Sequence, residues 1–324
     1  IPPDPIAASG PENLVAAVNS RVSLFNRDGS LIQSATLDDF FSTVTNIGSL
    51  FDPWVWFDPY SQRYFVLAEE VENGTVNMDG TGGNTKGGFG ADEGNVLIAV
   101  SAAANPDDLD TSAGDTDWHF YRIDTTADLN NDGTGSWLDY PKLATDDEYV
   151  YITGNYFNFG DRDFEGVRVT RLNKTPMLTG VALGMADRLD ADPPSDAFTL
   201  QPIASVGRDP DAPMVFVEAF DEDGLRIWEM DDSGDLTRAA FLSASYDEMS
   251  DGVPQRGTSL VLDSLSARLL NAVYRNGSIW TAHTVEVDDE ATVRWYEITD
   301  DQEGNYSLRQ RGDIDPGEDI HTFM

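Results

Sequence analysis

The sequence contains no cysteine and few basic residues, and these two gaps narrow the range of functions. Lys and Arg number 20 against 58 Asp and Glu, so the formal net charge is −38 over 324 residues. Without cysteine the chain can form neither disulfides, nor thiolate nucleophiles, nor cysteine-based zinc sites. A surface this acidic repels phosphates, which excludes nucleic acid and anionic membrane surfaces as default partners.

Long apolar runs are missing as well, and no segment approaches the length that a membrane span requires. Hydrophobic residues still make up 40% of the chain and aromatic residues 10%, which predicts a packed core rather than acidic disorder. The acidity comes mainly from 42 Asp, whereas Lys occurs three times. Such a surface stays hydrated at high salt, which fits a halophilic or marine source. Clustering of Asp in turns and calcium loops explains the same excess.

Helical periodicity is scarce too. Short segments rich in β-branched and aromatic residues, such as 63–68, 96–100 and 149–153, are separated by Gly, Asp, Asn and Pro. Turn signals such as Asn276-Gly277 stand between pairs of these segments, as hairpins require. A single helical turn at 37–42 is the longest helix that we expect. The sequence therefore predicts an all-β protein.

A weak internal repeat refines this prediction. An apolar pair, an Asp turn and a strong strand, usually opened by Pro, recur at starts near residues 6, 53, 141, 202 and 258. About four strands in ~40–60 residues are typical of β-propeller blades. We predict a β-propeller that occupies residues 1–324 as a single domain, with a Gly-rich surface insertion at 73–95. A β-sandwich with long loops is the alternative.

The two ends of the chain carry a further expectation. Five blades are readable, and the C-terminal end stops at the opening of a further blade, at 319–324. Because open blade edges are sticky, we expect a six- or seven-bladed ring completed by a second chain or fragment. A five-bladed ring closed by residues 312–324 is the alternative. The start Ile1-Pro2-Pro3, without Met, resembles a processed end and suggests a secreted, extracellular or cell-surface protein.

Several segments resemble a known family. They are Phe51-Asp-Pro, Asp58-Pro-Tyr-Ser-Gln-Arg-Tyr-Phe-Val, Asp139-Tyr-Pro-Lys-Leu, Asn271-Ala-Val-Tyr-Arg-Asn-Gly-Ser-Ile-Trp, Ala282-His-Thr and 293–298. These segments are similar to those of a family of largely uncharacterised bacterial secreted β-propeller proteins. The resemblance covers most of the chain from about residue 6 onward. It implies the propeller fold and secretion but no particular chemistry.

One Asp-rich segment has the spacing of a calcium loop. Counted from Asp128, Asn130 and Asp132 stand at positions 3 and 5, a glycine at 6, the carbonyl of Thr134 at 7 and Asp139 at 12. A hard cation with about six to eight oxygen ligands needs such a wrapped loop, in which glycine permits the sharp turn. We therefore predict Ca²⁺ at these five residues, in a structural role. A turn without an ion is the alternative, because Asp replaces the usual Glu at position 12.

Catalytic motifs are absent. The three histidines, His119, His283 and His321, lack the spacing of paired ligands, and no nucleophile elbow occurs. Whether the chain is an enzyme stays open at this point. We expect an extracellular calcium-stabilised propeller that acts in binding, adhesion or surface assembly, with a carbohydrate or surface-protein ligand. The alternative is a propeller enzyme, such as a lyase, glycosidase or lactonase-like hydrolase, with its site at the central mouth of the ring.

Overall fold

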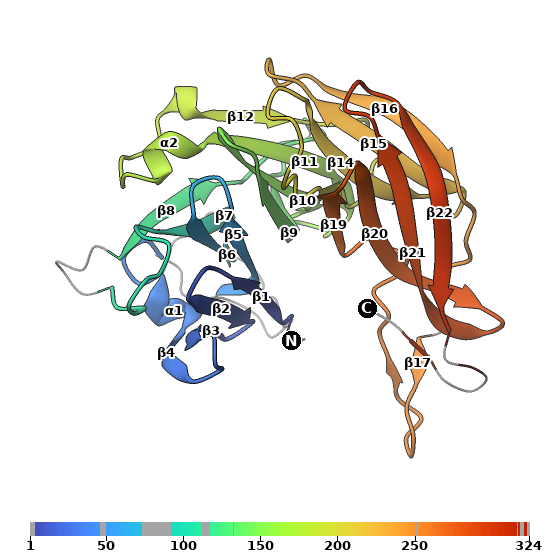
Figure 1. Cartoon of the computed structure of the whole chain (residues 1–324), viewed down its shortest axis with the longest axis horizontal. Helices are drawn as coiled ribbons and strands as arrows, with labels where there is room; N and C mark the ends of the chain where they lie inside the picture. The colour runs from blue at the N-terminus through green and yellow to red at the C-terminus, as the bar shows by residue number, and fades with distance from the viewer. Residues whose placement is uncertain are drawn as a thin grey trace. The chain divides into compact units, whose positions relative to one another are not determined.

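The computed structural model describes residues 4–45, 50–72, 92–111, 117–131, 133–249, 252–315, 317 and 321–322. Within this part of the chain almost all regular structure is strand, which confirms the all-β prediction. The strands form five four-stranded sheets in which strands consecutive in the chain are neighbours in the sheet (Figure 1). These sheets are the blades of a β-propeller.

Each blade takes its four strands in chain order, so the first strand of every blade is also an edge of its sheet. Blades 1 to 5 consist of β1 (Ile6–Ser9), β2 (Asn13–Val18), β3 (Arg21–Asn26) and β4 (Leu31–Thr36); β5 (Leu50–Asp58), β6 (Arg63–Glu72), β7 (Glu93–Ser101) and β8 (Trp118–Asp124); β9 (Ser136–Thr145), β10 (Tyr149–Asn158), β11 (Phe164–Asn173) and β12 (Arg188–Ala191); β13 (Gln201–Pro202), β14 (Met214–Phe220), β15 (Gly224–Met230) and β16 (Leu236–Ser243); and β19 (Asn271–Arg275), β20 (Ser278–Val287), β21 (Glu290–Asp300) and β22 (Tyr306–Ile314).

Helices are confined to single turns in the described residues. They are α1 (Leu37–Phe40), α2 (Lys174–Met177) and the 3₁₀ turn Met185–Asp187. The first of these confirms the helical turn predicted at 37–42. No helix in this part of the chain has the length and apolar composition that crossing a membrane requires.

The chain divides into two compact units, Ile1–Asp190 and Ala191–Met324. Unit 1 contains blades 1 to 3, and unit 2 contains blades 4 and 5. In unit 1 the first strands of the blades lie side by side, because β5 contacts both β1 and β9. The middle strands of blades 2 and 3 are buried on both faces; all residues of β7 after Glu93, for example, are buried. This is why they have continuous apolar sequences rather than alternating ones. The single-domain prediction stays a prediction.

Most of the predicted turns and blade starts agree with the structure, but two boundaries differ. The run near 258 does not open the fifth blade, which begins at β19. That run belongs to a separate ribbon of β17 (Val253–Pro254) and β18 (Val261–Leu262), because Gly257, with φ of 81°, turns it back on itself. The Gly-rich segment 73–95 lies largely outside the described residues, and its last three residues belong to β7.

The first strands β5 and β9 share a local irregularity. Asp52 and Tyr140 both have positive φ, 46° and 59°, and each is followed directly by proline. The pairing register shifts at both places, so each strand carries a β-bulge. Proline has no N–H to give to the ladder and is therefore tolerated at a bulge. A bulge re-aims the neighbouring side chains, and here these include two aspartates.

Candidate metal centre

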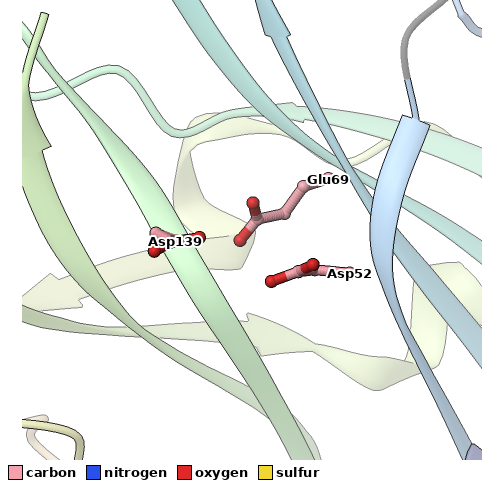
Figure 2. Close-up of side chains that lie close together, drawn as sticks. All are labelled: Asp52, Glu69 and Asp139. Carbon is pink, nitrogen blue, oxygen red and sulfur yellow. The ribbon is translucent and has the colours of Figure 1, made fainter. Parts of the chain in front are cut away.

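Three acidic side chains of unit 1 converge on one point. They belong to Asp52, Glu69 and Asp139, and one carboxylate oxygen of each lies within 4.8 Å of the others. Figure 2 shows the carboxylates of Asp52 and Glu69 directed toward that of Asp139. Within the described residues this is the one group of three or more His, Cys, Asp or Glu side chains whose ligand atoms come so close. We call these three residues the acidic centre.

The strand register explains how distant residues meet. Glu69 lies on β6 opposite Phe51 of β5, so it is next to Asp52, the positive-φ residue of the β5 bulge. Asp139 lies on β9, directly before the second bulge. Since β5 and β9 are in contact, two bulged first strands and one second strand contribute one carboxylate each. The acidic centre therefore joins blades 2 and 3.

Glu69 is the member of the acidic centre whose negative charge is the most costly to bury. Its side chain is buried, with 1% exposure, and neither carboxylate oxygen has a hydrogen-bond partner. Burial raises the pKa of Glu69 well above its ordinary value, and the charges of Asp139 and Asp52 raise it further. A buried carboxylate without hydrogen bonds or a counter-charge costs several kcal/mol. The side chain therefore requires either a proton or a cation.

Asp52 is perturbed in the same direction. Burial raises its pKa to about 7, with further contributions from Asp139 and Asp4. Its backbone N–H donates to the side-chain oxygen of Asn19, whose amide donates to Asp4. Blade 1 thus supplies an amide and a further carboxylate beside the acidic centre. These neighbours hold the chain in place but do not neutralise the charge.

Lys142 supplies a positive charge nearby. Its ammonium nitrogen lies 3.4 Å from the ring centroid of Tyr140 and 4.6 Å from that of Trp54. The charge of Lys142 lowers the pKa values of both Asp52 and Glu69, although burial and the neighbouring carboxylates outweigh it. Three carboxylates thus face one ammonium group. The arrangement therefore has an excess of negative charge, which a bound cation would neutralise.

The ligand atoms determine the class of ion. All three donors are carboxylate oxygens, which favour hard cations such as Ca²⁺, Mg²⁺ or Mn²⁺ over softer metals. Calcium binds oxygen at roughly 2.3–2.6 Å, so two of its ligands lie at most about 5 Å apart. The spacing of 4.8 Å or less in the acidic centre fits one shared ion of this size. The residues present can therefore hold a metal ion.

The predicted calcium loop is a separate feature. Asp128 and Asn130 are exposed, Thr134 is half-buried, and Asp132 lies outside the described residues. The loop is closed by paired backbone hydrogen bonds between Ala127 and Ser136, and Asp128 accepts a hydrogen bond from the N–H of residue 133 at 3.1 Å.

Asp139, the twelfth position of the predicted loop, lies beyond that closing pair on β9, and its carboxylate belongs to the acidic centre. Calcium binding by the loop stays a prediction.

Sequence reasoning missed two members of the acidic centre. Asp52 stands in the Phe51-Asp-Pro motif, and Glu69 follows the apolar run 64–68. One signal was available: the Asp-Pro and Tyr-Pro pairs occupy the same place in two successive blades. A Glu that directly continues an apolar run of five residues was a second signal, because such a run is typical of a buried strand.

Comparisons with known proteins do not identify a function for this chain, so the functional assignment depends on the geometry described above. No family model and no curated protein matches the sequence, so the family resemblance stays a prediction. One similar solved structure is Trypanosoma rangeli sialidase in complex with sialic acid, at 10% identity and a TM-score of 0.30. The match covers 89% of this chain and 52% of the sialidase, so the chain spans about half of the sialidase's length.

A second similar structure is endo-1,5-α-L-arabinanase from Thermotoga petrophila, at 11% identity and a TM-score of 0.22. That match covers 94% of each chain. Likeness at this level transfers no activity to the present chain. The propeller description therefore depends on the order of strands in the five sheets.

Proposed function

We propose that this chain is an extracellular, calcium-stabilised β-propeller that binds a carbohydrate or a surface protein, with calcium at the acidic centre. The observation that carries the proposal is Glu69, a buried carboxylate with no hydrogen-bond partner that faces Asp52 and Asp139. Calcium suits the site better than magnesium, which keeps several of its waters and rarely accepts an all-protein cage. Extracellular calcium modules bind with Kd values of roughly 0.1–1 mM, which is the range we expect.

The ion has a stabilising role. It joins β5 and β6 of blade 2 to β9 of blade 3, and it removes the repulsion between three neighbouring carboxylates. The predicted loop at Asp128 offers a second, more exposed calcium site. Neither site needs a catalytic group.

A hollow in unit 2 is the proposed ligand site. It has a volume of about 980 Å³, and its lining includes Phe198, Phe220 and Tyr246 together with Glu222 and Arg268. Aromatic surfaces with a few convergent polar groups are typical of small-molecule sites, and this combination suits a hydroxyl-rich ligand. Titration with neutral oligosaccharides tests this part, because Arg268→Ala should weaken any binding at the hollow.

The calcium site is tested by titrating metal-free protein with CaCl₂ and with MgCl₂ in a calorimeter. The wild type should bind calcium at the acidic centre more tightly than magnesium, and Glu69→Gln should lose that calcium ion. Glu165→Gln is the matched control, because Glu165 is a buried glutamate in blade 3 that accepts a hydrogen bond from Asn158. Calcium binding that survives in Glu69→Gln at full affinity would refute the site.

The hydrolase alternative has one observation in its favour. Asp52, with its pKa raised to about 7, lies beside Asp139, as a general acid lies beside a carboxylate. Glycosidase carboxyl groups, however, stand roughly 5–9.5 Å apart with the sugar between them. The acidic centre is tighter than this and includes the fully buried Glu69. A screen of glycoside and ester substrates tests the alternative, since Asp52→Asn should abolish any turnover that depends on this pair.

A further inference from the structure

Lys142 is fixed beside the acidic centre. Its side chain is buried, with 5% exposure, and its ammonium is held against the ring faces of Tyr140 and Trp54. Both aromatic residues belong to the bulged regions of the first strands, on β9 and β5. Cation–π contacts keep an ammonium in place when water is excluded. The charge of Lys142 therefore cannot swing away from the carboxylates into solvent, as a surface lysine would.

We propose that Lys142 sets the charge selectivity of the acidic centre, so that it accepts divalent cations and disfavours trivalent ones. This inference rests on the proposed cation site. Three carboxylates and one ammonium sum to −2, which a divalent ion neutralises and a trivalent ion exceeds. Without Lys142 the sum is −3, which matches a trivalent ion.

The direction of the effect does not depend on this count alone. Repulsion between the ammonium and a bound ion is proportional to the charge of the ion. The repulsion energy is therefore about 1.5 times as large for a trivalent ion as for a divalent ion at the same place, by Coulomb's law. Asp4 adds negative charge behind Asn19, but it does so equally in the wild type and in a Lys142 variant. Removal of the Lys142 charge must therefore strengthen trivalent binding more than divalent binding.

The test uses Tb³⁺ and Ca²⁺ as probes. Trp54 lies at the site, so terbium luminescence excited through tryptophan reports occupancy, and Ca²⁺ competition gives the second affinity. In Lys142→Met, an uncharged chain of similar length, we expect the ratio of calcium Kd to terbium Kd to rise by roughly tenfold or more. Lys142→Arg keeps the charge and should keep the wild-type ratio.

The outcomes separate this inference from the proposed function. If the wild type binds neither ion at the acidic centre, the proposed cation site fails, and the selectivity inference fails with it. If the wild type binds calcium but the ratio is the same in Lys142→Met, the site stands and the inference is overturned. An equal rise in Lys142→Arg would also overturn it, because the charge would then not be the cause. Should Lys142→Met fail to fold by circular dichroism, Lys142→Gln replaces it in the same comparison.

Discussion

Two buried glutamates on second strands show how differently the two units treat the same chemical group. Glu69 on β6 is 1% exposed and Glu218 on β14 is 0% exposed. Glu218 accepts hydrogen bonds from the indole of Trp228 at 3.0 Å, the backbone N–H of Phe198 at 2.9 Å and the guanidinium of Arg226 at 3.3 Å. Glu69 has no such partner and faces two aspartates instead.

The difference lies in where each counter-charge comes from. In unit 2 the chain itself supplies it, so Glu218 is a structural side chain. In unit 1 the chain supplies two more carboxylates and one ammonium group, that of Lys142, so the buried side chain of Glu69 still requires a proton or a bound cation. Two equally buried glutamates can therefore have different roles, and the groups that surround each carboxylate determine its role.

Glu218→Gln should give the largest change in stability. The substitution leaves the buried Arg226 with the exposed carboxylate of Asp196, at 2.8 Å, in place of its buried counter-charge, and loss of one member of a buried ion pair costs about 3–5 kcal/mol. Urea unfolding followed by tryptophan fluorescence measures the loss. Calcium binding at the acidic centre should remain unchanged in this variant. A loss below about 1 kcal/mol would show that the hydrogen bonds of Glu218 matter little.

Acid should weaken unit 2 through His283. Burial lowers the pKa of His283 to about 4, and its ring nitrogens contact the carbonyl of Ala267 and the hydroxyl of Tyr296. The unfolded histidine titrates near pH 6.5. Below that pH the unfolded state therefore binds a proton that the folded state does not bind until the pH approaches 4. Stability is therefore complete above about pH 6.5 and falls as the pH drops toward 4, by up to ~3 kcal/mol.

The measurement is the free energy of unfolding at a series of pH values, with His283→Gln as the comparison. The variant should be less stable than the wild type at pH 8. Between pH 6.5 and 4 its free energy of unfolding should fall by less than that of the wild type. Parallel pH curves for the two proteins would exclude His283 as the cause.

Glu69→Gln should stabilise the protein when calcium is chelated. The substitution removes the free-energy cost of burying or protonating the Glu69 carboxyl group, and the new amide can donate to Asp52 or Asp139. We expect a gain of about 1–2 kcal/mol in EDTA, opposite in sign to the effect of Glu218→Gln. Chemical denaturation in EDTA measures both variants side by side. A destabilised Glu69→Gln protein would mean that the ionised carboxylate contributes to the fold without any ion.

The smallest effect is expected at the predicted calcium loop. Asp128 is exposed, so Asp128→Ala should lower the free energy of unfolding by less than about 1 kcal/mol. It should also remove the weaker of two calcium equivalents in a titration and leave the tighter one. A titration in which both equivalents remain would show that the loop is only a turn.

The fold was largely predictable from the sequence, and the reasons are local. Asn276 and Gly277 both have positive φ between β19 and β20, as their turn signal predicts. The apolar run near 258 misled the prediction of the fifth blade start, because a short β-type run does not show whether it pairs inside a blade or in a ribbon. Val261 is exposed in that ribbon.

The acidic centre was less predictable. Asp139 was singled out for the loop at Asp128, on spacing along the chain. Its actual neighbours, Asp52 and Glu69, are 87 and 70 residues away in the sequence and meet it through contact between β5 and β9. Such a contact depends on the bulge register, which no local spacing reveals.

The central claim is that a divalent cation compensates the buried charge of Glu69, and calorimetric melting with and without calcium tests it most directly. On transfer from EDTA to about 10 mM CaCl₂, a site with a Kd of roughly 0.1–1 mM should stabilise the wild type by about 1.4–2.7 kcal/mol, or several degrees in Tm. Glu218→Gln should show the same rise from a lower Tm, and Glu69→Gln should lose most of it. Equal rises in the wild type and Glu69→Gln, or no rise in the wild type, would contradict the account.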